Sequence, residues 1–218
     1  MTKWGDRVAR REDILAAGRG VLERDGYARL NMRAVADRAR VSPGTLYTYF
    51  ASKEALFAAL YTERLEELGR ELRDEAFTGL HTAEEVIVAF MEHWFPIYSL
   101  FGHQIDVWGT LAGDSVLPPD AGQRLVGAAV SVIAEVREAL GRFEPGLPEA
   151  AELGLAVPFV WSAVNGLAEH FRGPRHGLHP HSRDELTHFA ARALVSGVRA
   201  ALGLTHASPT HTATTTRS

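Results

Sequence analysis

The chain has 218 residues, of which 46% are hydrophobic and 23% charged, and its formal net charge is −4. This length can bury one good core, or one core with a small appended module. No apolar run approaches the roughly 18 residues that span a bilayer, and the charged residues 1–11 do not resemble a signal peptide. The absence of cysteine excludes disulfides and thiolate metal sites. We therefore expect a cytoplasmic protein.

The charge is unevenly distributed along the chain. Residues 1–53 carry eleven Lys or Arg against six Asp or Glu, a net +5, whereas residues 54–218 carry twelve against twenty-one, a net −9. A basic module on an acidic body suggests that the first segment faces a polyanion such as nucleic acid. A chance excess of cations on a solvated helix face is the alternative.

The N-terminal quarter has the punctuation of short helices. A first helix is expected over Val8–Asp25, with Gly26 suited to the position after its end. Asn31 is a favourable N-cap for a second helix that ends near residue 39. Ser42 can cap a third helix, with Pro43 at its first position, where the missing N–H costs nothing.

The rest of the chain also shows helical spacing. Ser52 can cap a long fourth helix, and further helices are expected over about 82–108, 121–140, 149–171 and 182–202. Pro96 should bend or split the first of these. The buried stripe of the helix over 121–140 is expected at Val126, Ala129, Ile133, Val136 and Leu140. The pattern predicts an all-α fold of about nine helices, in which a three-helix N-terminal unit joins a larger bundle through the fourth helix.

The second and third helices have the outline of a helix-turn-helix, because both are short and the turn at 39–42 is tight. Tyr47 and Tyr49 have the reach and the hydroxyl that suit phosphate oxygens. Lys53, one of only two lysines, can bind a phosphate together with the N-terminus of the fourth helix, although a solvated lysine is the alternative. Small or thin residues would let the third helix approach base edges closely: Ser42, Pro43, Gly44, Thr45 and Thr48.

The segment from about Ile14 to Phe57, above all VSPGTLYTYFASKEALF at 41–57, resembles the DNA-binding domain of the tetracycline-repressor (TetR) family of bacterial one-component transcription regulators. The resemblance covers about a quarter of the chain closely. It implies a homodimer that binds a palindromic operator, usually represses, and releases DNA when a small molecule binds the C-terminal domain. By position it implies phosphate contacts from Asn31, Tyr47, Tyr49 and Lys53, and base contacts from Arg33, Pro43, Gly44, Thr45 and Thr48, with Arg33 as a guanine reader.

On this resemblance we expect a DNA-binding domain over 8–53, a ligand-binding and dimerisation domain over 54–203, and a disordered tail over 204–218. Arg40 departs from the family pattern, which usually has glycine in the turn between the second and third helices. If that residue requires a positive φ, arginine costs on the order of 1 kcal/mol. Alternatively, the turn relaxes and the guanidinium gains a phosphate contact.

Aromatic residues at helical spacing in the C-terminal part are either plain core or the wall of an apolar pocket. The family resemblance favours a pocket for an apolar or aromatic small molecule. The expected lining residues are Phe90, His93, Trp94, Tyr98, Phe101, Gln104, Ile105, Trp108, Phe159 and Trp161.

The last two helices carry small residues, which allow close approach between helices. These residues could pack within one chain, or form half of an intermolecular four-helix bundle, which the resemblance favours. The expected interface residues are Gly154, Ala163, Gly166, Ala190, Ala193, Gly197 and Ala200.

Three alternatives compete with this interpretation. His176, His179 and His181, with His188 nearby, could ligate zinc or nickel, but a loop with two Gly and two Pro is the simpler explanation, and we expect no metal and no cofactor. An enzyme would leave the basic segment unexplained, and none of the common catalytic motifs stands in the chain. A protein-docking helix-turn-helix is the third alternative, and would bind DNA without steep salt dependence.

Overall fold

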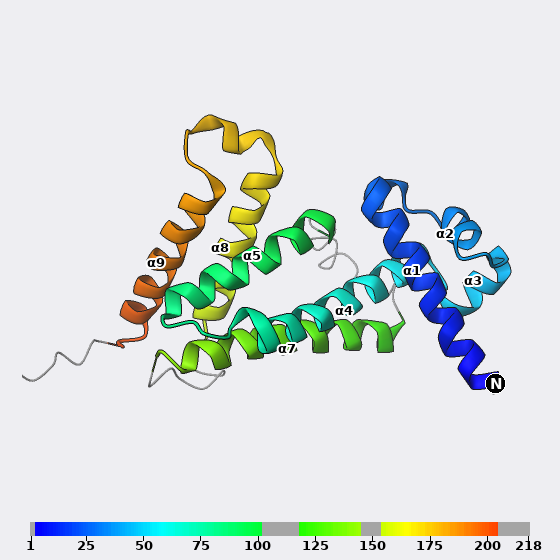
Figure 1. The fold of residues 1–218 in the computed structure, drawn as a ribbon, viewed down its shortest axis with the longest axis horizontal. Helices are drawn as coiled ribbons and strands as arrows, with labels where there is room; N and C mark the ends of the chain where they lie inside the picture. The colour runs from blue at the N-terminus through cyan, green and yellow to red at the C-terminus, as the bar shows by residue number, and fades with distance from the viewer. Residues whose placement is uncertain (1–2, 102–117, 145–153, 205–218) are drawn as a thin grey trace, which may run out of the picture.

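The computed structural model describes residues 3–101, 118–144 and 154–204, and within these ranges every regular element is helical. Figure 1 shows an elongated molecule with α1–α3 at one end and the pair α8 and α9 at the other. The α-helices are α1 (Lys3–Arg29), α2 (Met32–Arg38), α3 (Pro43–Tyr49), α4 (Lys53–Glu71), α5 (Ala83–Phe101), α7 (Pro119–Gly141), α8 (Ala156–Arg172) and α9 (Arg183–Ala201). The all-α prediction is confirmed, with eight α-helices in the described ranges rather than about nine.

Local hydrogen bonds set most of the helix starts. Asn31, Ser42 and Ser52 each accept a hydrogen bond from the backbone N–H three residues later, as N-caps do. The start of α9 has a full capping box, in which Ser182 and Glu185 satisfy each other's backbone N–H groups. These predicted starts are therefore confirmed.

Two expectations about helix ends and bends need correction. The first helix starts at Lys3 rather than Val8, whereas its predicted end before Gly26 is confirmed, since Gly26 has a positive φ of 74° and a ψ of 172°. Pro96 does not split α5, which continues from Ala83 to Phe101. Pro96 is exposed, so the missing hydrogen bond lies on the solvent side of the helix, where water can satisfy the orphaned carbonyl. Most of the tail predicted from residue 204 lies outside the described residues.

The helix α4 joins the two ends of the molecule. Its first turns pack into the N-terminal core, where Leu56 and Leu60 lie against Gly18 of α1. Further along, Phe57 and Tyr61 contact the ring of Phe101 in α5, with centroids 5.3 and 5.0 Å apart. The expected domain boundary after residue 53 therefore falls at the start of a helix whose side chains belong to both cores.

Ion pairs fasten α1 to α4 beside this core. Arg19 lies 3.2 Å from a Glu63 oxygen and 3.5 Å from Glu67, and Arg11 lies 3.7 Å from Glu63. Burial raises the pKa of the Glu63 carboxyl, and the two arginines partly offset that rise. The pair of helices is thus held at a constant angle under α2 and α3.

The helix α7 packs along α4, in a register that differs from the expected one by one residue. Its buried side chains are Leu125, Ala128, Val132 and Ala139, whereas Val126 is 60% exposed. The prediction that Val126 is buried is therefore wrong. Ala129, Ile133, Val136 and Leu140 are only partly buried, because they flank the face that contacts α4 rather than occupying its centre.

Candidate DNA-binding and effector sites

The helix-turn-helix has a closed apolar core. Val35, Ala36 and Leu46 are fully buried, and Phe50 is 5% exposed, so α2 and α3 are held together by the residues that the sequence pattern predicts. Val41 donates a backbone hydrogen bond to the Ala36 carbonyl at 3.0 Å across the turn. This core fixes the direction in which α3 faces solvent.

Arg40 in the turn has a φ of 55°, in the left-handed region that favours glycine. Among the described residues it is the only non-glycine residue with a positive φ. Of the two alternatives for this position, the structure shows the one in which the turn keeps its tight geometry. Arg40 therefore adopts a left-handed backbone conformation that is sterically unfavourable for a residue with a Cβ, and its side chain is exposed.

Several of the predicted DNA-contacting side chains are engaged within the motif itself. The Asn31 amide accepts from the Ala34 N–H at 2.9 Å and donates to the Arg29 carbonyl at 3.1 Å. Ser42 Oγ accepts from the Thr45 N–H at 3.0 Å and lies 2.8 Å from Thr45 Oγ1. Thr48 donates to the Thr45 carbonyl at 2.6 Å. These groups shape the surface of α3 before any partner arrives.

The outer surface of α3 is open and thin. Ser42, Pro43, Gly44 and Thr48 are exposed, and a Cβ added at Gly44 would meet only the Ser42 hydroxyl, at 3.9 Å. Tyr47 is 51% exposed. Another backbone or a base edge could therefore approach α3 closely, as a helix that enters the major groove requires.

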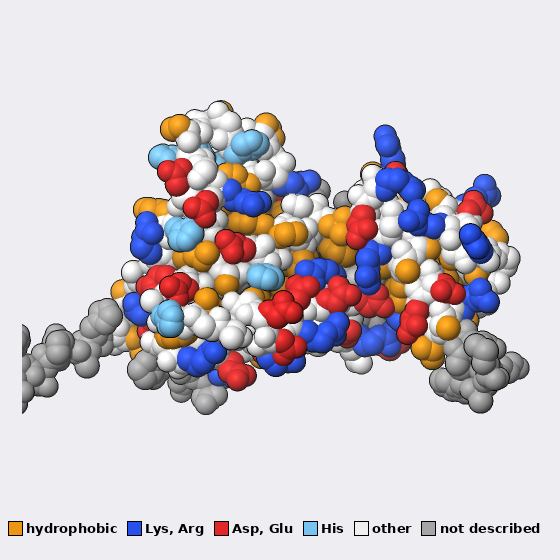
Figure 2. All heavy atoms as spheres, viewed as in Figure 1, with side chains coloured by type: hydrophobic (Ala, Val, Ile, Leu, Met, Phe, Trp, Pro, Cys, Tyr) orange, Lys and Arg blue, Asp and Glu red, His pale blue; other side chains and the backbone are white. Residues whose placement is uncertain are grey.

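Cations surround this surface. Arg33 is exposed at the start of α2, and the Lys53 ammonium lies 4.0 Å from the centroid of the Tyr27 ring at the start of α4. Arg7 of α1 lies 6.0 Å from the centre of the Tyr49 ring, a neighbour that the sequence analysis missed although Arg7, Arg10 and Arg11 are close in sequence. Figure 2 shows Lys and Arg side chains over the end of the molecule that carries α1–α3.

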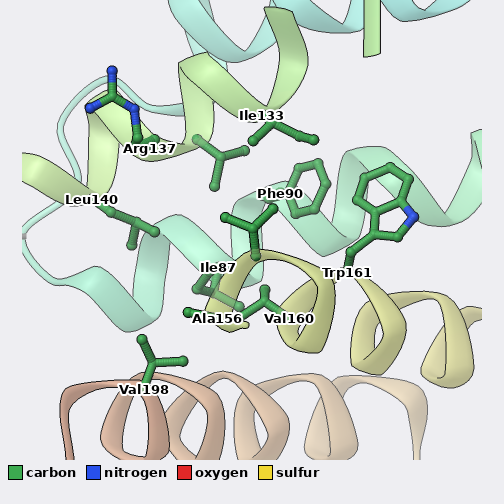
Figure 3. Close-up of a pocket in the computed structure, with 11 residues that line it drawn as sticks. Ile87, Phe90, Ile133, Arg137, Leu140, Ala156, Val160, Trp161 and Val198 are labelled. Atoms are coloured by element: carbon green, nitrogen blue, oxygen red, sulfur yellow. The ribbon is translucent and has the colours of Figure 1, made fainter. Parts of the chain in front are cut away.

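A cavity of about 100 Å³ lies in the C-terminal part, between α5, α7, α8 and α9 (Figure 3). Of the residues predicted to line a pocket, Phe90 and Trp161 line it. The other lining residues were missed by the sequence analysis: Ile87, Ile133, Val136, Arg137, Leu140, Ala156, Val157, Val160 and Val198. Aliphatic residues on four separate helices give no local signal that distinguishes a cavity wall from ordinary core.

Trp94 supports this wall from behind and is fully buried. Its indole lies 4.7 Å from that of Trp161 and 6.1 Å from the Phe90 ring, measured between centroids. The indole N–H of Trp94 donates to the side-chain oxygen of Asn165 in α8 at 2.9 Å, so its polar atom is satisfied inside the apolar surroundings. Trp94 thus holds Phe90 and Trp161 in place.

The remaining predicted pocket residues lie elsewhere. His93 Nδ1 is 2.8 Å from the Ala89 carbonyl on its own helix, and Tyr98 is buried. Phe101 packs between Phe57 and Tyr61, and Phe159 is 56% exposed on the outer side of α8. None of these four side chains lines the described cavity. Gln104, Ile105 and Trp108 lie outside the described residues.

The outward faces of α8 and α9 are apolar and contain small residues. Phe159 and Phe189 are 56% and 62% exposed, and Leu155 is 87% exposed just before α8. Of the predicted interface residues, Ala163 and Ala190 are half-buried, whereas Gly154, Gly166, Ala193, Gly197 and Ala200 are exposed. A Cβ added to Gly166 or Gly197 would meet no atom within 4 Å, so these glycines are not needed for packing within one chain.

The histidines between α8 and α9 contact one another. His170 and His179 place their Nε2 atoms 2.8 Å apart, and the backbone N–H of His181 donates to His179 Nδ1 at 3.2 Å. His176 Nδ1 lies 2.7 Å from the Gly173 carbonyl. No group of three or more His, Asp or Glu in the described ranges is arranged to hold a metal ion. Within these ranges no helix is long and apolar enough to cross a membrane.

Comparison with known proteins places the strongest sequence similarity in the N-terminal part. Residues 14–60 match the model of the family described as "Bacterial regulatory proteins, tetR family". An uncharacterized HTH-type transcriptional regulator of Mycobacterium tuberculosis strain H37Rv is 44% identical over 55 residues, 25% of this chain and 26% of that protein. The HTH-type transcriptional repressor KstR of Mycolicibacterium smegmatis is 39% identical over 70 residues, 32% of this chain and 34% of that protein.

Solved structures are similar over nearly the whole chain at lower identity. A tetR-family transcriptional regulator from Streptomyces coelicolor has a TM-score of 0.64 at 16% identity, covering 90% of this chain and 86% of that one. The regulator FadR from Bacillus subtilis, solved in complex with stearoyl-CoA, has a TM-score of 0.56 at 19% identity, covering 85% of this chain and 98% of that one. At these identities the likeness establishes a shared fold. The family model and the named relatives describe regulators rather than enzymes.

Proposed function

We propose that this chain, whose residues 14–60 match the tetR family of bacterial regulatory proteins, is a transcriptional repressor. In this proposal it binds a palindromic operator as a homodimer and leaves the operator when a small apolar molecule enters its C-terminal cavity. It would therefore act in the cytoplasm, where the DNA is. The observation that carries the proposal is the open, thin surface of α3 ringed by cations.

The helix α3 supports DNA reading by its shape and its surroundings. Pro43, Gly44 and Tyr47 are exposed to solvent on α3. The hydroxyls of Ser42 and Thr48 are already hydrogen-bonded to the backbone of the motif, which keeps the surface of α3 narrow. We propose that Arg33 reads a guanine, because an exposed guanidinium can bind O6 and N7 together. Lys53, Tyr47 and Tyr49 would bind phosphates on either side of the groove, with Asn31 at the start of α2.

The exposed faces of α8 and α9 support a homodimer. Two phenylalanines that are more than half exposed, with small residues on the same helices, form a surface that a second copy could cover. Two helices from each copy would build a four-helix bundle, with Gly166 and Gly197 allowing close approach. The twofold axis of such a dimer matches the symmetry of a palindromic operator.

The cavity supports an apolar effector. Its wall is almost entirely aliphatic and aromatic, which suits a hydrocarbon group. A structural neighbour, FadR, was solved with an acyl-CoA, so a related fold accommodates a long hydrocarbon chain. We propose Phe90 and Trp161 as ligand contacts, and extend the site to the aliphatic residues of α7, α8 and α9.

The helix α7 offers a path between the two sites. Its second half lines the cavity with Ile133 and Leu140, while its first turn, near Asp120, lines a groove with Tyr47 to Phe50 at the end of α3. A ligand that shifts α7 would therefore change the position of α3 relative to the C-terminal helices. The relative KstR is a transcriptional repressor, which supports the repressor role that we propose.

Footprinting of the purified protein on the DNA upstream of its own gene tests the proposal. We expect a protected palindrome, and an affinity that falls steeply as salt rises, because phosphate contacts release counterions. Sedimentation of the complex should show two chains per operator. A single protected half-site bound by a monomer, or binding that salt leaves unchanged, would contradict the proposal and favour the protein-docking alternative.

A further inference from the structure

The effector cavity carries one charged side chain. Every residue that lines it is apolar except Arg137, which directly follows Val136 on α7. Figure 3 shows the stem of Arg137 alongside the apolar side chains, with its guanidinium extending away from them at the margin. An occupant of the cavity would therefore have hydrocarbon contacts on most sides and one cation at the mouth.

Arg137 also differs from its neighbouring arginines in having neither a salt bridge nor a hydrogen bond from its side chain within the described ranges. Arg124 of the same helix pairs with Asp120 at 3.1 Å, and Arg142 donates to the Phe77 carbonyl at 3.3 Å. Arg73 pairs with Glu135 from another element at 2.5 Å. The cation at the cavity mouth is thus available to an anion from outside the chain.

A second, smaller cavity of about 50 Å³ continues the first. It shares the residues Ile87, Leu140, Val160 and Val198 with the larger one, so the two spaces lie against the same side chains. Arg199 and Glu144 also line the smaller space, where they are paired with each other, and Arg199 lies 3.6 Å from Glu84, so the charge there is already neutralised. Within the described ranges, Arg137 is therefore the charged lining residue of the two spaces that has no ionic partner.

We propose that this site binds a small carboxylic acid with a hydrocarbon tail, whose carboxylate pairs with Arg137. The inference rests on the proposed function, because it takes the cavity to be the effector site. The tail lies between α5, α7, α8 and α9, and the carboxylate stays at the mouth. A guanidinium can donate two parallel hydrogen bonds to a carboxylate, which makes Arg137 selective for an acid over an alcohol of the same length.

The size of the site sets the size of the tail. A cavity of about 150 Å³ lined by aliphatic and aromatic residues holds a benzene ring. The two spaces of about 100 and 50 Å³ suit a tail of comparable bulk. Octanoate is a suitable probe, because it is ionised at neutral pH and has a flexible hydrocarbon chain. Octan-1-ol and octylamine are matched probes with a neutral and a cationic head.

Isothermal titration of the full-length protein with the three probes tests the inference, and the intrinsic tryptophan fluorescence, to which Trp161 in the cavity wall contributes, provides a second signal. We expect octanoate to bind about tenfold to a hundredfold more tightly than octan-1-ol, with octylamine the weakest. The variant R137Q should lose that difference for octanoate and bind octan-1-ol as before. R137K, which keeps the charge, should restore part of it.

R124Q is the matched control, since it removes an exposed arginine from the same helix far from the cavity. It should leave octanoate binding unchanged. Equal binding of octanoate and octan-1-ol, an unchanged octanoate affinity in a folded R137Q, or no binding of any probe would overturn the inference.

Operator release separates this inference from the proposed function. If octanoate binds through Arg137 but the operator stays bound, the inference holds and ligand-induced release is wrong. If octan-1-ol binds as tightly as octanoate and releases the operator equally, release holds and the acid-binding role of Arg137 is wrong.

Discussion

The N-terminal domain and the C-terminal body differ in how far sequence similarity to known proteins accompanies structural similarity. The N-terminal domain, with α1–α3 and the first turns of α4, shares clear sequence identity with other regulators, and its core is closed. Solved structures share the fold over 90% and 85% of the chain at only 16% and 19% identity, and the C-terminal body contains a cavity and exposed phenylalanines. In the proposed function the first domain has to match the geometry of a DNA duplex, whereas the body has to match only its own ligand and a second copy of itself.

The use of polar side chains differs in the same way. In the N-terminal domain the polar side chains of the motif, such as Asn31 and Ser42, accept hydrogen bonds from nearby backbone N–H groups. These bonds give the short helices defined ends. In the body, long helices are held by side chains from distant segments, as where Trp94 donates to Asn165. Local bonds therefore define the helix ends of the first domain, whereas packing between distant segments holds the body together.

The largest expected effect comes from opening the N-terminal core. Leu46 is fully buried, so Leu46→Ala should lower the free energy of unfolding by about 3 to 5 kcal/mol, through lost transfer energy and a cavity. It should also lower operator affinity in the fraction that remains folded. Urea unfolding followed by circular dichroism and a mobility-shift assay at low temperature measure the two effects.

Met91→Ala provides the matched control in the body, since Met91 is also fully buried. It should cost a similar free energy of unfolding and leave operator affinity of the folded protein intact. If both variants lost operator binding equally, the two regions would not be separable in the way the comparison requires.

The second effect concerns the faces of α8 and α9. Replacing both exposed phenylalanines, with Phe159→Asp and Phe189→Asp together, should weaken dimerisation by about 2 to 4 kcal/mol, because buried carboxylates would replace aromatic contacts. Sedimentation equilibrium measures the change, and the helical content should stay constant since both side chains are exposed in the single chain.

Val126→Asp tests whether an acidic residue at any exposed apolar position would weaken the dimer. Val126 is 60% exposed on α7, away from the proposed interface, so its replacement should leave the dimer unchanged. A dimer weakened by Val126→Asp and unaffected by the phenylalanine pair would move the interface to α7.

The third effect distinguishes base reading from phosphate binding. Arg33→Ala should cost about 1 to 3 kcal/mol of discrimination at one operator position, because a guanine loses its paired donors. Lys53→Ala should weaken binding to every sequence and reduce the slope of affinity against salt by about one. Binding to operators randomised at single positions, measured at several salt concentrations, separates the two.

Arg192→Ala is the control for general loss of charge, because this exposed arginine lies on α9. It should change neither the operator preference nor the salt slope. Variants of Arg33 and Lys53 that both bind like the unchanged protein would show that the DNA contacts are assigned wrongly.

The smallest effect tests the turn. Arg40 has a φ of 55°, so Arg40→Gly should raise the free energy of unfolding by about 1 kcal/mol or less, as glycine relieves the steric cost but adds entropy to the unfolded chain. Ala39→Gly at a φ of −76° should instead lower it. Thermal unfolding of the two variants side by side measures the difference in sign.

Much of the fold was predictable because its signals are local. A serine or asparagine that caps a helix bonds a backbone N–H only three residues away, so Ser42, Ser52 and Ser182 could be assigned without knowing what packs around them. The helix-turn-helix core was predictable for a related reason, since Val35, Ala36 and Leu46 lie within a dozen residues.

The cavity was only partly predictable from the sequence because nothing local marks its lining residues. Phe90 and Trp161 were anticipated, but Phe101 closes the contact with α4, and Arg137 was not singled out. Neighbouring positions on a helix differ by about 100°, so a stripe read from α7 can miss its packed face by one residue, as happened at Val126.

By itself, the sequence determined where most helices start, the shape of the DNA-reading motif and the sign of its charge, because these depend on bonds within a turn and on composition. Only the tertiary structure decided which face of α7 packs against α4, where four helices leave a space, and that Arg137 is the cation at its edge. Those features depend on the angles at which distant helices meet, and many different aliphatic sequences satisfy the same angles.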